Sequence, residues 1–190
     1  TNPQALEKLT GWVNARDAGR QPAAMYAMGS LLLAKDDLAG AVKMAEDGLS
    51  KYPQSLPVQT LSLNTITTLL DKNRVEDAER LISKYPGTSP GLVFQQGALA
   101  FRKGDYPLAQ SLFREAARRA SEKTAESALF NENLAALNAN DAAGAAALVK
   151  EAAGSAQLRE HILFEQAHYA AKRMNPQAPE LLASFVALAT

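Results

Sequence analysis

Two histidines and a glutamate near the C-terminal end have the spacing of a metal site. His161, Glu165 and His168 follow one another at steps of four and three residues, which would place all three side chains on one helix face. Two imidazoles and a carboxylate can hold a divalent ion and leave coordination positions open, as in a catalytic zinc site. The commoner meaning of such a pattern is a set of solvated side chains on an exposed helix, and we expect no metal here.

The same histidines indicate a second, milder role in binding. An imidazole takes up a proton between about pH 5 and 7, and the added charge changes how a surface attracts its partner. This hypothesis predicts an affinity that varies over that pH range and no longer varies in a double His→Ala variant.

Other catalytic patterns are missing from the sequence. The chain has no cysteine, which excludes disulfides, thiolate metal sites and cysteine nucleophiles. It has no Walker-type phosphate loop and no G-x-G-x-x-G or G-x-S-x-G turn, and a Ser-His-acid triad would have to recruit one of the two histidines. We therefore expect a non-catalytic protein that needs no cofactor.

Charge and hydropathy exclude further classes of partner. Lys plus Arg and Asp plus Glu number 20 each, so the chain lacks the net charge that attracts nucleic acid or anionic membranes. The most apolar stretch, residues 181–189, is shorter than the roughly 18 residues that a membrane-spanning helix needs. The chain opens with Thr1 and not Met, so we expect that an N-terminal piece, with any signal peptide, precedes it.

A short signature recurs five times and indicates what positions these side chains. A large apolar residue begins each copy, at positions 25, 58, 93, 129 and 163, so the spacing is 33 to 36 residues. This is the period of a two-helix repeat. The copies are Met25-Tyr26, Val58-Gln59, Val93-Phe94, Leu129-Phe130 and Leu163-Phe164.

Apolar residues at steps of three and four predict the helices themselves. The first helix of each unit is predicted at 22–34, 56–71, 90–103, 123–139 and 157–173, and the second at 38–51, 75–85, 107–120, 142–153 and 178–188. A further helix is predicted at 3–16. Polar breakers separate the two helices of a unit, Gly104 is expected in the left-handed conformation, and Pro53 and Pro86 are expected to end the second helices before them.

These residues make the chain resemble a tetratricopeptide repeat (TPR) protein, and in particular the bacterial members of that family. The third unit follows that family's pattern best, with Val93, Gly97, Ala100, Ala109, Phe113 and Ala116, whereas the fourth has Asn133 where glycine is usual. The resemblance covers residues 22–174. It implies an all-α, right-handed α-solenoid of stacked antiparallel helix pairs, a single domain over residues 1–190. Its parts would be an N-terminal capping helix at 1–21 and repeats at about 22–54, 55–89, 90–125, 126–157 and 158–190.

The resemblance also implies a binding surface. In this family the residue after the first large apolar position of each unit faces the concave groove, as do residues four, seven and eight further on. The groove residues so implied are Tyr26, Gln59, Leu63, Phe94, Phe101, Phe130, Leu134, Phe164 and His168. Aromatic side chains give a large contact area at small cost in conformational entropy, which suits a partner helix or an extended peptide. The alternative is that these rings pack between adjacent first helices.

Two functions follow as expectations. One is a non-catalytic scaffold or adaptor that binds a peptide or helix of a partner protein in the groove. The other is a structural spacer or self-association module of a larger assembly, with the apolar C-terminal helix as a possible homo-oligomer contact. The family's carboxylate-binding mode is disfavoured because Ser30, Thr60, Leu63 and Ala98 replace its Lys and Asn residues.

The last residues of the first two repeats give an indication of the cellular compartment. Lys51-Tyr52-Pro53 and Lys84-Tyr85-Pro86 resemble the repeat ends of bacterial envelope proteins of this family, including periplasmic lipoproteins of outer-membrane assembly and cell division. This resemblance favours the bacterial periplasm, with the cytoplasm as the alternative.

Overall fold

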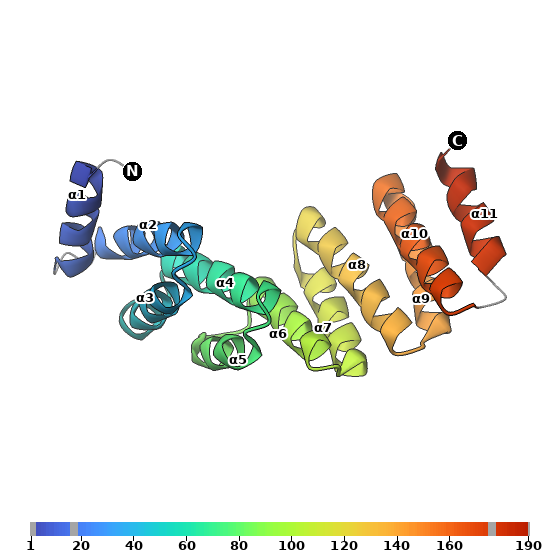
Figure 1. Ribbon diagram of the computed structural model, residues 1–190, viewed down its shortest axis with the longest axis horizontal. Helices are drawn as coiled ribbons and strands as arrows, with labels where there is room; N and C mark the ends of the chain where they lie inside the picture. Colours follow the sequence, from blue (N-terminus) through green and yellow to red (C-terminus); the bar gives the residue numbers. More distant parts are fainter. Residues whose placement is uncertain (1–2, 16–18, 175–177, 190) are drawn as a thin grey trace. The chain divides into compact units, whose positions relative to one another are not determined.

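The computed structural model describes residues 3–15, 19–174 and 178–189, and all regular secondary structure within these ranges is helical (Figure 1). The all-α class is thereby confirmed. The helices are α1 (Pro3–Asn14), α2 (Gln21–Ala34), α3 (Leu38–Lys51), α4 (Leu56–Asp71), α5 (Val75–Lys84), α6 (Pro90–Arg102), α7 (Tyr106–Arg119), α8 (Glu122–Asn138), α9 (Ala142–Glu151), the short 3-10 helix η1 (Ala152–Gly154), α10 (Ala156–Lys172) and α11 (Ala178–Ala189). No helix in these ranges is both long and apolar enough to cross a membrane.

The helix boundaries agree with those predicted from the sequence to within about two residues. The second helices of the first two units end at Lys51 and Lys84, just before the Tyr-Pro pairs, as proline's effect on the preceding backbone predicts. Two ends differ. The helix predicted at 3–16 ends at Asn14, with residue 16 outside the described ranges, and the helix predicted at 142–153 ends at Glu151 and continues as η1.

The turn after each first helix has one recurring backbone feature. A residue with positive φ stands two residues beyond the helix, and such residues recur as Asp36, Asn73, Gly104, Asn140 and Met174. Gly104 has φ +79°, which confirms the prediction for that residue. In three turns the next residue is an aspartate that caps the second helix. Asp37, Asp105 and Asp141 accept hydrogen bonds from the backbone N–H three residues on, at 2.9, 3.2 and 2.8 Å.

The chain forms two compact units, residues 1–95 and residues 96–190, and the boundary lies within α6. In the first unit α1 packs on α2, α2 packs on α3 and α4, and α5 packs on α3 and α4 (Figure 1). Val58, Leu61, Ile66 and Leu69 of α4 have no exposed surface, so α4 is the centre of this core. The single-domain solenoid stays a prediction.

In the second unit α8 packs on α7, α9 and α10, and α11 packs on α10. Phe113, Leu148 and Ile162 are its largest buried apolar side chains. Gly97 permits a close approach at the start of this unit, because a Cβ atom there would lie 2.9 Å from the ring of Phe113. Ala109, another residue of the repeat pattern in this unit, has no exposed surface.

Candidate functional site

The residues that the sequence assigned to a binding surface all reach solvent to some degree. Tyr26 is 37% exposed, Phe164 is 47% exposed and His168 is exposed, while Gln59, Leu63, Phe94, Phe101, Phe130 and Leu134 are half-buried. The residue before an aromatic is buried instead in four of the five cases, as Met25 and Leu163 illustrate at 2% and 6% exposed, whereas Leu129 before Phe130 is half-buried. Successive residues on a helix point about 100° apart, so one helix can place the first in the core and the second outside.

In the first unit the candidate residues come from three helices. Tyr26 lies on α2, Gln59 and Leu63 lie on α4, which packs against α2, and Phe94 lies on α6. The Gln59 amide turns back along its own chain, where Nε2 donates to the carbonyl of Pro53 at 2.9 Å. Leu63 approaches α6 closely, with Cδ1 3.0 Å from the place of a Cβ atom at Gly91.

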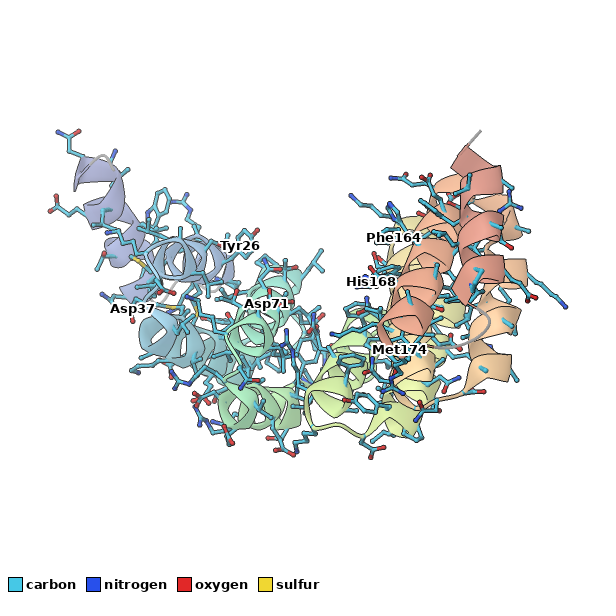
Figure 2. All side chains as sticks on the ribbon, turned by 45° about the vertical axis from the view of Figure 1, so that its right-hand side comes forward. Tyr26, Asp37, Asp71, Phe164, His168 and Met174 are labelled. Carbon is cyan, nitrogen blue, oxygen red and sulfur yellow. The ribbon has the colours of Figure 1, made fainter. Side chains whose placement is uncertain are left out.

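The second unit places an aromatic cluster on α10 and α11. Phe164 meets Phe185 of α11 edge to face with ring centroids 5.5 Å apart, and His168 one turn along α10 lies 6.0 Å from the same Phe164 ring. Phe164 and His168 lie on the same side of α10 (Figure 2). Phe164 and His168 line an apolar groove of about 570 Å³ between α10 and α11. Its other lining residues are Ala167, Ala171, Ala178, Pro179 and Leu182. His168 is the one titratable side chain among its lining residues.

A second, more polar groove lies between the N-terminal halves of α8 and α10. Its volume is about 300 Å³, and Phe130 and His161 line it with their rings 6.3 Å apart and nearly perpendicular. Lys123 and Glu126 of α8 supply opposite charges to its wall. Elsewhere Phe101 packs edge to face on Tyr106 at 5.3 Å, beside the turn between α6 and α7.

The histidine spacing does not produce a metal centre. His161 packs toward Phe130 and His168 toward Phe164, so the two imidazoles contact different rings. Within the described ranges no three His, Cys, Asp or Glu side chains are placed to hold a metal ion. The two histidines instead belong to the two grooves.

Buried polar contacts hold α8, α9 and α10 in the positions that shape these grooves. Gln166, 4% exposed, donates from Nε2 to Oδ1 of Asn133 at 2.8 Å and to the carbonyl of Ala145 at 2.7 Å. Asn133 lies between Phe130 and Leu134 on α8, and Gln166 lies between Phe164 and His168 on α10. The hydrogen bond between Gln166 and Asn133 therefore holds α8 and α10 together on the buried side of the candidate residues.

A buried carboxylate lies beside this contact. Glu132 has no exposed surface, and Arg114 of α7 donates to its Oε1 from Nε at 2.7 Å and contacts it from Nη2 at 2.5 Å. Burial raises the pKa of the Glu132 carboxyl, and the Arg114 guanidinium offsets only part of that rise. Its other oxygen, Oε2, is buried without a hydrogen-bond partner among the described residues.

Sequence reasoning missed a third cavity, of about 220 Å³, which residues of α9, α10, α11 and the turn before α9 enclose. Arg173 lies 4.4 Å above the ring of Tyr169 and donates to Oδ1 of Asn140. Asp141 also lines this cavity, and hydrogen bonds from the Gln110 side chain and the Gly144 N–H lower its pKa. In the sequence, this cavity could have been recognised only from the four-residue spacing of Tyr169 and Arg173, which allows a cation–π contact on one side of a helix.

No family model, no curated protein and no solved structure matches the chain. The relation to the tetratricopeptide repeat family therefore stays a prediction that depends on the residue pattern.

Proposed function

We propose that the chain is a non-catalytic interaction scaffold, a TPR-like solenoid that binds a peptide or helix of a partner protein along its first helices. One observation carries the proposal. The aromatic and apolar residues that a groove would need are all partly open to solvent, and Phe164, His168 and Leu182 line a continuous apolar groove. Exposed apolar grooves of this kind are typical of partner sites.

The geometry favours a protein segment as the occupant. The groove between α10 and α11 is lined by apolar side chains and one imidazole, so it suits apolar side chains and offers few directional hydrogen bonds. The neighbouring groove at Phe130 and His161 adds Lys123, Glu126 and Asn131, which suit polar side chains or backbone groups of the same segment. Alternating apolar and polar contacts are how helices and extended peptides are recognised.

The experiment is a selection of random 16-residue peptides displayed on phage, with the whole chain immobilised. Fluorescence anisotropy then measures the affinity of the selected peptides for Phe164→Ala and for Leu108→Ala. The two residues are matched, because Phe164 is 47% and Leu108 of α7 is 48% exposed. Phe164→Ala should weaken binding about tenfold or more, since truncation of an aromatic anchor typically costs about 2 kcal/mol. Leu108→Ala should leave it within twofold.

The proposal fails if no peptide is enriched, or if the selected peptides bind both variants equally well. Peptides lost with Leu108→Ala and kept with Phe164→Ala would place the site on the second helices instead.

A second function, self-association, has one specific observation in its favour. Leu182 and Val186 of α11 are 54% and 51% exposed although they are apolar and one turn apart. This outer stripe of α11 could contact another copy of the chain or another part of an assembly.

A further inference from the structure

Charge is distributed unevenly between the helices of the first unit. The chain as a whole is 21% charged, yet α2 contains no charged residue, α4 contains one, its last residue Asp71, and the part of α6 within this unit, residues 90–95, contains none. The second helices of the same unit differ. Their charged residues are Lys43, Glu46, Asp47 and Lys51 on α3, and Glu76, Asp77, Glu79, Arg80 and Lys84 on α5.

This absence of charge extends to surface that solvent reaches. We define the uncharged face as Tyr26 and Ser30 of α2, Leu63, Asn64 and Thr67 of α4, and Phe94 of α6, all within residues 1–95. Tyr26, Asn64 and Thr67 are exposed, and the other three are half-buried. A helix face that meets only water usually carries charged side chains, so a solvent-exposed face without them needs another explanation.

The polar groups of the uncharged face are partly engaged already. The hydroxyl of Thr67 donates to the carbonyl of Leu63 at 3.0 Å and accepts from Nε2 of buried Gln95 at 2.7 Å. The Thr68 hydroxyl donates to the carbonyl of Asn64 at 2.9 Å. The six residues of the uncharged face therefore present apolar surface, methyl groups and weak acceptors to a partner, and the one charge on α4 is Asp71, a turn beyond Thr67 at the end of the helix.

We infer that the partner segment which lies on the uncharged face is itself uncharged, with apolar and Ser, Thr, Asn or Gln side chains over that stretch. A charged side chain buried against this face would lose its hydration without meeting an opposite charge among the six residues, and this would weaken binding. The inference rests on the proposed function and names the chemical class of its partner. It applies to the first unit alone, because α8 and α10 expose Lys123, His168 and Lys172.

The test uses the same phage-displayed random peptides, selected on the whole chain. Tyr26→Ala identifies peptides that use the first unit, and Phe164→Ala identifies those that use the second. Tyr26-dependent peptides should contain an uncharged run of about six residues, and their Kd should change less than twofold between 50 and 500 mM NaCl.

Charge addition gives the matched comparison. Asn64→Asp, in the middle of the uncharged face, should weaken Tyr26-dependent peptides about tenfold, whereas Ser50→Asp on α3 adds the same charge to an exposed second-helix position and should change Kd less than twofold. Both variants should leave Phe164-dependent peptides unaffected.

The outcomes separate this inference from the proposed function. If Tyr26-dependent peptides carry charges and their affinity falls with salt, the inference is wrong but the proposed scaffold function stands. The same conclusion follows if every selected peptide depends on Phe164 and none on Tyr26. A dimer of the free chain that dissociates in Asn64→Asp, measured by sedimentation velocity, would make a second copy the occupant and also overturn it. If no peptide binds the chain at all, both the inference of an uncharged partner and the proposed scaffold function are wrong.

Discussion

The Glu132 carboxylate, which has no exposed surface, accepts a 2.7 Å hydrogen bond from Nε of Arg114, whose side chain is 36% exposed. A buried charge thus has its partner on the surface of the unit. Glu151 lies 3.9 Å from the same guanidinium and is more exposed than Glu132. Because Arg114 supplies both the hydrogen bonds to Oε1 and the nearest opposite charge, its loss would leave the Glu132 carboxyl without a partner in the interior.

Replacement of Arg114 by methionine should therefore destabilise the second unit. We expect the free energy of unfolding to fall by about 2–3 kcal/mol at pH 7, somewhat less than for a fully buried ion pair, because Arg114 is partly hydrated already. Urea unfolding followed by circular dichroism measures the change. Arg119→Met is the matched control, since Arg119 pairs with exposed Glu115 at 2.7 Å in a bridge worth less than about 1 kcal/mol. Equal losses for the two variants would contradict this account.

Glu132 itself should make stability depend on pH in an unusual direction. Burial raises the pKa of Glu132 in the folded state above its ordinary value of 4.5. A carboxyl with a raised folded pKa favours folding below its unfolded pKa, and that contribution is lost as pH rises through the folded pKa. The advantage of Glu132→Gln over the wild type should thus grow from pH 4 to pH 7 in urea unfolding. A constant difference would show that Glu132 has the same pKa in both states.

The first unit should respond to acid in the opposite direction. Burial alone would raise the pKa of Glu46, but Lys84 at 3.0 Å and Arg80 at 3.2 Å lower it overall, and Arg80 and Arg74 lower that of Asp77 likewise. Depressed folded pKa values contribute stability above the unfolded pKa, and this is lost as pH falls through the folded pKa.

Hydrogen exchange of amides in α3 and α5 between pH 5 and 3, corrected for the intrinsic rate, measures the effect. Glu46→Gln should reduce the loss of protection on acidification relative to the wild type, whereas Glu76→Gln, an exposed residue on α5, should not. Identical acid profiles for all three proteins would contradict the assignment.

The helices could be predicted because their signals are local. The repeat period, the polar breakers and the Tyr-Pro pairs at 52–53 and 85–86 act within a few residues of the boundary they set. The outward direction of Tyr26 and Phe164 was also predictable, since each follows a large apolar residue that enters the core.

Other features depend on partners far away in the sequence. Glu132 stands between two asparagines and looks like a surface residue, and only Arg114, eighteen positions earlier, makes its burial tolerable. The directions of His161 and His168 toward separate rings depend on side-chain rotamers, which spacing does not determine. The positive φ of Met174 has no local signal, because methionine seldom adopts it.

Met174 offers a simple route to a more stable protein. Its φ is +53° and its side chain is 92% exposed, so the backbone carries strain and the side chain adds little packing (Figure 2). Met174→Gly should raise the free energy of unfolding by about 0.5–1 kcal/mol, because glycine adopts this conformation without a Cβ clash. Asn73→Gly is the control, with φ +58° at an exposed asparagine, and should change stability by less than about 0.3 kcal/mol because asparagine tolerates the left-handed region. A loss of stability in Met174→Gly would mean that the side chain makes contacts that outweigh the strain.

Val186 distinguishes self-association from peptide binding. It is 51% exposed on α11 and does not line the groove that Phe164, His168 and Leu182 form, so a charge there should leave the groove intact. If α11 joins two copies of the chain, sedimentation equilibrium should show a dimer in the wild type that Val186→Asp weakens at least tenfold, since a carboxylate buried in an apolar contact costs well over 1.4 kcal/mol. Leu108→Asp introduces the same charge at a similarly exposed leucine on α7 and should leave the dimer unchanged. If the wild type stays monomeric at high concentration and binds peptides as tightly as Val186→Asp does, the outer stripe of α11 has no part in self-association. The groove at Phe164 would then be the surface that binds partners.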